Sequence, residues 1–306
     1  MIKHFFISLL VLIILVLSIF FGLSSYKSKE KIIKFQNIDR RYRLHIPSNL
    51  DGGKSYPLVI SLHGLTDDPR IMELYTGFSS QADKKGFFAA YPYGLKAKGM
   101  LSPRSWNSEF CCSFAYQENI DDVGFISALI DEISSNYTID KNKIYIIGYS
   151  NGGMLAYSLA SKLSDKISAV AVVNAAVGGK GEEDEKIKLI NKSYKPVSIA
   201  IIHGRFDKSI LFDGGVGSGG LYEFSAAYDS VNFWLDNNGC NKYPNEIAKR
   251  DDYQKEIYNE CWDGKKVLFY SVNGAHIWPG GLFDPIKFFS KDSFKATNEI
   301  LNFFGL

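Results

Sequence analysis

The chain has 306 residues, of which 46% are hydrophobic and 22% are charged, and these proportions are typical of a globular protein. They exclude a disordered chain, a collagen-like repeat and a polytopic membrane protein. Lysine and arginine total 35 against 33 aspartates and glutamates, a net charge of +2, so no large positive field is present to hold nucleic acid.

The chain begins with a long apolar segment. Residues 5–23 are Phe, Ile, Leu and Val, interrupted only by two serines and one glycine. This length nearly crosses a bilayer and exceeds the apolar centre of most cleavable signals. We therefore expect residues 1–26 to form an N-terminal hydrophobic helix that anchors the protein in a membrane, with a cleaved signal peptide as the alternative. Both interpretations imply export, and residues 27–34 would then form a short charged spacer.

From Tyr42 onward, short β-branched or aromatic runs alternate with longer segments of helical periodicity. This alternation predicts an α/β fold with a mostly parallel central sheet and helices on both faces. No Pro- or Gly-rich linker divides the pattern, so residues 35–306 are expected to form one catalytic domain. The predicted strands are 43–46, 58–62, 87–91, 143–147, 169–173, 197–202 and 267–272, and the predicted helices are 71–85, 123–135, 152–163, 225–237 and 293–304.

A candidate nucleophile follows the predicted strand at residues 143–147. The string GYSNGG starts at Gly148 and leads directly into the predicted helix at 152–163. A nucleophile elbow needs glycine on both sides of its serine because the turn is strained and tightly packed, and Gly148 and Gly152 meet this need. We expect Ser150 to be the nucleophile; the alternative is a serine that caps the helix.

A serine nucleophile needs a general base, and the base needs a carboxylate to orient it. His276 follows the predicted strand 267–272, and Asp207 follows the strand 197–202, so both should lie at the same edge of the sheet. The order Ser, Asp, His along the chain is that of an α/β hydrolase. Asp213 and Asp229 are alternative acids downstream of the same strand.

The same edge of the sheet offers candidate donors for an oxyanion hole. The backbone N–H of Leu65 follows the strand 58–62, and that of Asn151 follows the nucleophile. Two such donors would stabilise the negative oxygen of an acyl-transfer intermediate.

The sequence offers no motif for a cofactor or a metal. Gly215, Gly217 and Gly220 satisfy GxGxxG, but no strand leads into them and no helix follows at once, as a dinucleotide site requires. HExxH and close histidine pairs are absent from the sequence, so we expect neither a cofactor nor a metal.

Four cysteines are too few for a disulfide scaffold. Cys240 and Cys261 flank a polar stretch, and in an oxidising compartment a bridge between them would stabilise the fold by constraining the unfolded chain. The neighbouring Cys111 and Cys112 are interpreted as small buried hydrophobic residues, with their pairing left open.

Six strings together resemble the secreted polyhydroxybutyrate depolymerase-like and feruloyl or acetylxylan esterase-like α/β hydrolases. The resemblance extends from about Phe35 to the C-terminus and implies an α/β-hydrolase fold. It implies the triad Ser150, Asp207 and His276 and is consistent with the Cys240–Cys261 pair. It also implies that Trp106 and Trp278 wall the substrate pocket; the alternative is that both are ordinary core tryptophans. The strings are LHGLTDD (62–68), SWNSEFCC (105–112), IDDVGF (120–125), GYSNGG (148–153), HGRFD (203–207) and GAHIWPGG (274–281).

These features predict an exported serine esterase that forms an acyl-enzyme. Its expected substrates are polyhydroxyalkanoate oligomers or the feruloyl or acetyl esters of polysaccharides. A serine peptidase on the same fold and an anchored binding module without turnover are the alternatives, because GxSxG does not distinguish an ester from an amide. The expected partners are the ester substrate and, through the N-terminal segment, a membrane.

Overall fold

The computed structural model describes residues 28–99, 102–181, 184–284 and 293–306. The apolar segment that is expected to anchor the chain lies outside these residues. Within them, no helix combines the length and the apolar character that crossing a membrane requires.

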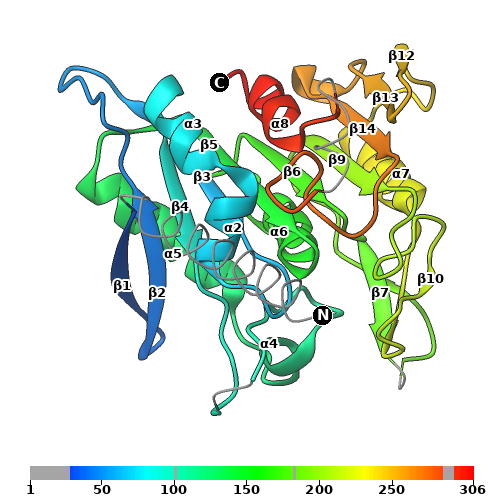
Figure 1. Ribbon diagram of the computed structural model, residues 1–306, viewed down its shortest axis with the longest axis horizontal. Coiled ribbons are helices and arrows are strands. Elements are labelled where there is room, and N and C mark those ends of the chain that lie inside the picture. Colours follow the sequence, from blue (N-terminus) through cyan, green and yellow to red (C-terminus); the bar gives the residue numbers. More distant parts are fainter. Residues whose placement is uncertain (1–27, 100–101, 182–183, 285–292) are drawn as a thin grey trace, which may run out of the picture.

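A ten-stranded sheet forms the centre of the described structure, in the order β1-β2-β4-β3-β5-β6-β9-β14-β13-β12 (Figure 1). The six strands from β4 to β14 in this order run parallel to one another. Apart from the polar residues 140–143 of β5, these strands are largely buried on both faces, which explains why most of their residues are apolar. The expected α/β fold with a mostly parallel central sheet is therefore confirmed. The parallel strands are β3 (Tyr56–Leu62), β4 (Phe88–Pro92), β5 (Ile139–Tyr149), β6 (Ala169–Val173), β9 (Ser198–Gly204) and β14 (Val267–Val272).

An antiparallel hairpin forms each edge of this sheet. One edge is formed by β1 (Lys29–Phe35) and β2 (Ile38–His45), and the other by β12 (Glu246–Lys249) and β13 (Tyr253–Tyr258). The expectation of a spacer is therefore wrong for residues 29–34. Exposed and half-buried residues alternate from Glu30 to Phe35, because only one face of this edge strand packs against the core, through Ile33 and Phe35.

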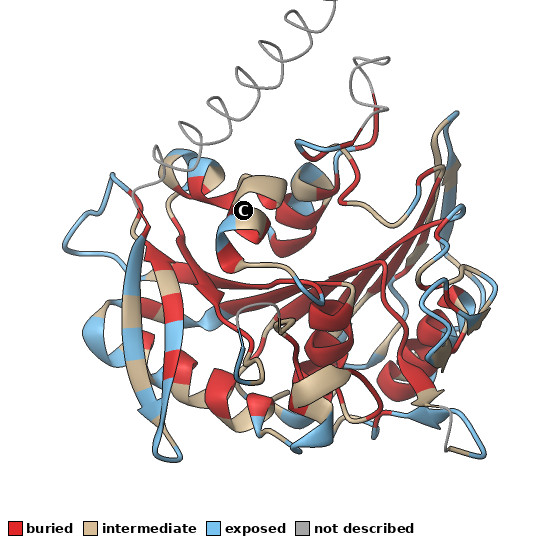
Figure 2. Ribbon diagram, turned by 60° about the horizontal axis from the view of Figure 1, so that its bottom comes forward, coloured by how far each residue is buried: buried red, intermediate tan, exposed pale blue. Residues whose placement is uncertain are grey.

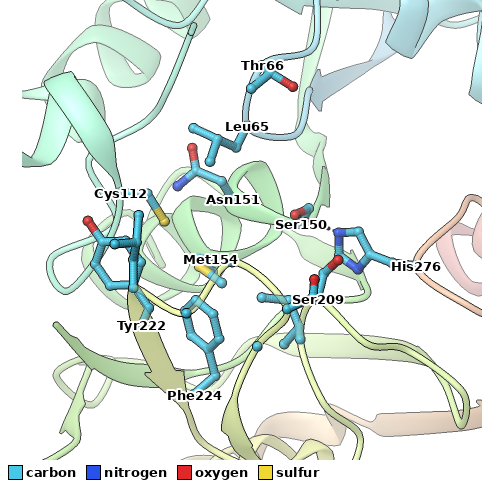
Figure 3. Close-up of a pocket in the computed structure, with 16 residues that line it drawn as sticks. Leu65, Thr66, Cys112, Ser150, Asn151, Met154, Ser209, Tyr222, Phe224 and His276 are labelled. Carbon is cyan, nitrogen blue, oxygen red and sulfur yellow. Dashed lines mark hydrogen bonds between the residues drawn. The ribbon is translucent and has the colours of Figure 1, made fainter. Parts of the chain in front are cut away.

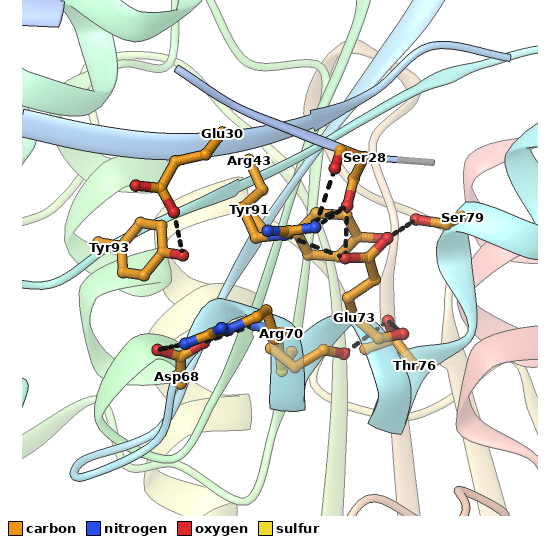
Figure 4. Close-up of polar contacts among 11 residues, drawn as sticks. Ser28, Glu30, Arg43, Asp68, Arg70, Glu73, Thr76, Ser79, Tyr91 and Tyr93 are labelled. Carbon is orange, nitrogen blue, oxygen red and sulfur yellow. Dashed lines mark hydrogen bonds and ion pairs between the residues drawn. The ribbon is translucent and has the colours of Figure 1, made fainter. Parts of the chain in front are cut away.

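A buried polar cluster holds the start of the described chain against the domain (Figure 4). Ser28 Oγ donates a hydrogen bond to Glu73 Oε2 at 2.8 Å, and Arg43 Nη2 donates to Ser28 Oγ at 2.8 Å. Glu73 is 1% exposed and also accepts a hydrogen bond from Ser79. A buried carboxylate is tolerated only when it is paired and hydrogen-bonded. The chain is thus fixed to the body of the protein from Ser28 onward.

Helices cover both faces of the sheet (Figure 2). On one face, α5 (Asp122–Asn136), α6 (Asn151–Lys162) and α7 (Ala227–Asn238) form a core with the apolar side chains of the strands. The opposite face carries α2 (Pro69–Thr76), α3 (Phe78–Lys85) and α8 (Ala296–Phe304). The single helix predicted over 71–85 is two helices, because Gly77 adopts a left-handed conformation (φ 62°) and ends the first of them.

A second, small sheet has the order β10-β11-β7-β8, and none of its strands was predicted. All four strands are only two to four residues long, and two of them contain glycine, so they lack the apolar alternation by which strands are recognised in a sequence. They are β7 (Gly178–Gly181), β8 (Lys188–Leu189), β10 (Gly215–Val216) and β11 (Tyr222–Phe224). Two short helical segments, α4 (Ser113–Gln117) and η1 (Trp262–Gly264), complete the elements of the described residues.

All four cysteines are paired in the structure. Cys240 and Cys261 form a disulfide with an Sγ–Sγ distance of 2.00 Å, which links the loop after α7 to the loop after β13. Cys111 and Cys112 are buried, as expected of small hydrophobic residues, and are bonded to each other.

Candidate active site

Ser150 lies at the sharp turn between β5 and α6, with φ 53° and ψ −124°. Few residues other than glycine adopt such a backbone conformation, so the surrounding packing must impose it. A Cβ atom on Gly148 would overlap the backbone of Gly152, and a Cβ atom on Gly152 would overlap the carbonyl oxygen of His63. The two glycines therefore allow the start of α6 to pack directly against the ends of β5 and β3.

Ser150, His276 and Asp207 form a continuous hydrogen-bonded series. His276 Nε2 lies 2.9 Å from Ser150 Oγ, and His276 Nδ1 lies 2.7 Å from Asp207 Oδ2. The second carboxylate oxygen of Asp207 accepts the backbone N–H groups of Ser209 at 2.8 Å and Ile210 at 2.9 Å. The loops after β9 and β14 thus bring together three side chains that are far apart in the sequence.

The alternative acids do not take this position. Asp213 is exposed to solvent. Asp229 accepts a hydrogen bond from the backbone N–H of Ala226 at the start of α7, so it stabilises a helix terminus.

Asn174 was not singled out from the sequence, yet it holds the loop that carries His276. Its side chain is buried at the end of β6, where Oδ1 accepts the N–H of Gly204 at 2.9 Å. Its Nδ2 donates to the carbonyl of Ile277 at 2.8 Å. One amide therefore connects the turn that precedes Asp207 to the turn that carries His276. No sequence motif marked it, because its partners are backbone atoms of distant loops.

The backbone N–H groups of Leu65 and Asn151 are both free. Across the described part of the chain, neither of them donates a hydrogen bond to another protein group. Both residues border the same cavity as Ser150. The N–H of Thr66 is not available, since it donates to the carbonyl of Arg104 at 3.0 Å.

His63 shapes the turn that carries Leu65. Its Nδ1 lies 2.7 Å from the carbonyl oxygen of Gly64, and its Nε2 accepts the N–H of Gly94 at 2.9 Å. The proton must therefore reside on Nδ1, because Nε2 acts as the acceptor. Burial lowers the pKa of His63 to about 4, so the ring is neutral near pH 7.

A cavity of about 340 Å³ opens beside Ser150 and His276 (Figure 3). Its floor and walls come from the turn after β3, from α6, from the loop after Asp207 and from the small sheet. The side chains that give it an apolar character are Leu65, Met154, Ile210, Leu221, Tyr222 and Phe224.

Neither of the tryptophans expected to wall the substrate pocket borders this cavity. Trp106 is 0% exposed and packs within the core, so the expectation is wrong for it. Trp278 is also buried and donates from Nε1 to Thr297 Oγ1 at 3.1 Å; it lines a separate hollow of about 40 Å³ behind His276.

The described residues contain no group of three or more His, Cys, Asp or Glu side chains that could hold a metal ion. Gly217 and Gly220 border the cavity, in the loop between β10 and β11. The GxGxxG spacing thus belongs to a strand-loop-strand unit, whereas a dinucleotide site has a strand-to-helix turn.

Relatives of known name include several esterases. The chain is 30% identical over 172 residues to the bifunctional acetylxylan esterase/xylanase XynS20E of Neocallimastix patriciarum, which covers 56% of this chain and 22% of that protein. It is 27% identical over 239 residues to feruloyl esterase B of Piromyces equi, covering 77% of this chain and 42% of that protein. The matches thus span less than half the length of these two relatives. A probable feruloyl esterase C of Aspergillus niger is 27% identical over 250 residues, covering 78% of this chain and 76% of that protein.

Solved structures share the fold at low sequence identity. An acetyl xylan esterase from Aspergillus awamori superposes with a TM-score of 0.61 at 13% identity, covering 90% of this chain and 99% of that one. A CE1 ferulic acid esterase from Anaeromyces mucronatus, in complex with ferulic acid, gives 0.53 at 15% identity, covering 88% and 91%. These structures support the fold alone.

The model of a family described as phospholipase/carboxylesterase matches residues 51–218, more than half of the chain. The resemblance to feruloyl and acetylxylan esterase-like α/β hydrolases is confirmed by this match and by the relatives above. The chain belongs to the phospholipase/carboxylesterase family of α/β hydrolases.

Proposed function

We propose that this protein is a serine esterase that hydrolyses carboxylic esters through Ser150, His276 and Asp207. The observation that carries this proposal is the unbroken series from Ser150 Oγ through the imidazole of His276 to Asp207, at 2.9 Å and 2.7 Å. The esterase names of the relatives support the same class of reaction.

In the proposed mechanism, His276 Nε2 takes the proton of Ser150 as the serine oxygen attacks the ester carbonyl carbon. The carbonyl oxygen becomes negative and accepts the free N–H groups of Leu65 and Asn151. The imidazolium of His276 then gives its proton to the leaving alcohol, and an acyl-enzyme remains. Water, deprotonated by the same imidazole, attacks the acyl carbon and releases the acid and free Ser150. Asp207 holds the imidazole with its proton on Nδ1 and stabilises its positive charge.

The cavity beside Ser150 favours a large apolar acyl group. A volume of about 340 Å³ lined by leucine, methionine, isoleucine and aromatic side chains would leave most of its surface uncovered by an acetyl group. Among the expected substrates, feruloyl esters of polysaccharides therefore fit best, ahead of acetyl esters and hydroxyalkanoate oligomers.

We also propose that the enzyme acts outside the cytoplasm, anchored by residues 1–26. The apolar run at 5–23, which contains no charged residue, supports a membrane-inserted segment, and the Cys240–Cys261 disulfide is typical of an oxidising compartment. Full-length protein should then remain with membranes after alkaline carbonate washing. A chain that starts at Ser28 should be released, and release of the full-length chain would contradict the anchor.

Hydrolysis by the wild-type protein and by Ser150→Ala tests the proposed chemistry. We expect the substitution to reduce kcat on methyl ferulate by on the order of a millionfold, because the nucleophile is lost. Equal rates for the two proteins would refute the mechanism. A panel of methyl ferulate, acetylated xylan, 3-hydroxybutyrate oligomers and a peptide amide of ferulic acid would rank the substrates, and preference for the amide would indicate a peptidase.

A further inference from the structure

Trp106 lies in the loop between β4 and α4, behind the wall of the cavity. It is 0% exposed, and its indole Nε1 donates a hydrogen bond to the carbonyl oxygen of His63 at 2.9 Å. Its backbone N–H donates to Asn151 Oδ1 at 2.8 Å, and its carbonyl accepts Asn151 Nδ2 at 3.0 Å. One residue is therefore bonded both to the turn after β3 and to the first residue of α6.

These two contacted segments carry the free N–H groups beside Ser150. On one side, Asn151 itself carries a free N–H, and its side chain is held at both ends by Trp106. On the other side, the peptide unit that contains the N–H of Leu65 also contains the carbonyl of Gly64, which accepts His63 Nδ1–H at 2.7 Å. Because a peptide unit is planar, fixing that carbonyl also fixes the direction of the N–H. The ring of His63 in turn packs against the indole, with ring centroids 5.0 Å apart.

We infer that Trp106 is a positioning residue that holds the N–H groups of Leu65 and Asn151 at the separation that an oxyanion requires. The inference rests on the proposed function, since it gives those N–H groups a role in the reaction. Trp106 does not touch the substrate cavity. It acts through its hydrogen bonds to His63 and Asn151, which fix the orientation of the two N–H groups.

The loop that carries Trp106 is itself held from the opposite side. The N–H of the next residue, Asn107, donates to Asp122 Oδ2 at 2.8 Å. Asp122 pairs with Arg40 at 2.6 Å, with side chains 0% and 1% exposed. A buried pair with additional hydrogen bonds has few alternative arrangements, so it provides a rigid base for this loop.

A second buried tryptophan shows that burial alone does not require such contacts. Trp234, on α7, is also 0% exposed, and no hydrogen-bond partner of its Nε1 is found among the described residues. Replacing it with phenylalanine removes an indole from the same core without removing a hydrogen bond. Trp234→Phe is therefore the matched control for Trp106→Phe.

The test compares steady-state kinetics of the full-length wild type, Trp106→Phe and Trp234→Phe on methyl ferulate. A phenyl ring retains most of the packing but cannot donate to His63. We expect Trp106→Phe to lower kcat by about 10–100-fold, because small displacements of catalytic groups cost this much. Its KM should stay within about twofold, because the donors act mainly in the transition state. Trp234→Phe should keep the wild-type kcat.

The affinity for phenylboronic acid distinguishes a loss of the oxyanion donors from a general loss of packing. Boronic acids form a tetrahedral, negatively charged adduct with an active-site serine, so their binding depends on the oxyanion donors. Trp106→Phe should weaken this binding by about the same factor as kcat/KM, while the affinity for the product ferulate stays the same. Equal losses for boronate and ferulate would overturn the inference.

If Trp106→Phe folds and keeps the wild-type kcat while Ser150→Ala is inactive, the role of Trp106 is refuted and the proposed function stands. Activity retained by Ser150→Ala would instead refute the proposed function. If Trp106→Phe does not fold, Asn151→Ala removes the other contact with Trp106 and keeps the backbone N–H. We expect the same pattern of lower kcat and unchanged KM, and a folded Asn151→Ala with wild-type kcat would overturn the inference.

Discussion

The two sides of the cavity differ in how tightly they are packed. On the catalytic side, Asp207 is 3% exposed, and Gly148 and Gly152 have no room for even one more carbon atom. On the opposite side, formed by the small sheet and its loops, Leu221 is 60% exposed, and a Cβ atom added to Gly219 would meet no other atom within 4 Å. The groups proposed to carry out the reaction are thus held by many contacts, whereas the groups proposed to contact the acyl chain are held by few.

This difference in packing predicts that substitutions on the two sides will have different effects. A substitution on the catalytic side should alter the reaction or the fold, because each residue there has several partners. A substitution on the opposite side should alter which ester is preferred and leave the fold intact. Loops supported by a rigid framework commonly carry specificity in this way.

The largest effect is expected on the catalytic side, for Asp207→Asn. The N–H groups of Ser209 and Ile210 will keep an oxygen facing them, so the new NH₂ group must face His276. An NH₂ group there forces the imidazole into the wrong tautomer, and kcat should fall by about 10⁴-fold. Steady-state kinetics would measure this loss, with Asp213→Asn as the control that keeps its activity. A similar loss in the control would refute the assignment of Asp207.

A matched pair of glycine substitutions tests the difference in packing directly. Gly148→Ala should lower the free energy of unfolding by about 3 kcal/mol, because its Cβ overlaps the backbone of Gly152. Gly219→Ala should change it by no more than about 0.5 kcal/mol, because the space around it is open. Urea denaturation measures both values. Equal destabilisation would show that the two sides are packed alike.

Acidification should destabilise the folded protein through His63, which lies on the catalytic side. Burial lowers its pKa from 6.5 to about 4, so between these values the unfolded chain binds more protons than the folded protein. The free energy of unfolding should therefore fall as the pH drops from 6.5 toward 4, by up to about 1.4 kcal/mol per pH unit from this group. Burial also lowers the pKa of His203, which acts in the same direction.

Urea denaturation at pH 7 and pH 5 would measure this dependence. His63→Asn should be less stable at pH 7 and should show a smaller loss between the two pH values. A variant with the same pH dependence as the wild type would show that His63 does not contribute.

The smallest effect is expected on the opposite side, for Leu221→Ala. Loss of an apolar contact with a large acyl group should reduce kcat/KM on methyl ferulate by about tenfold. Hydrolysis of p-nitrophenyl acetate should change by less than about twofold, because an acetyl group does not reach this wall. Equal changes in kcat/KM for the two esters would show that the small sheet does not contact the acyl group.

Much of this protein can be predicted from local sequence patterns. The parallel strands are recognisable because each contains a continuous apolar run. Ser150 is recognisable because a glycine-bounded serine between a strand and a helix is typical of a nucleophile elbow. Asp207 and His276 follow from their positions after strands. These signals are local, since each depends on a few consecutive residues.

Other features depend on contacts between distant segments. The sequence of β1 suggests a spacer because most of its charges face solvent. The strands of the small sheet escape prediction because two to four residues are too few to show a pattern. The resemblance places Trp106 at the substrate pocket, although its hydrogen bonds join residues 43 and 45 positions away. Backbone carbonyls and N–H groups are present in nearly every residue, so no sequence motif reveals which of them a buried indole or amide will bind. Only the packing of β3, α6 and the loop after β4 decides that.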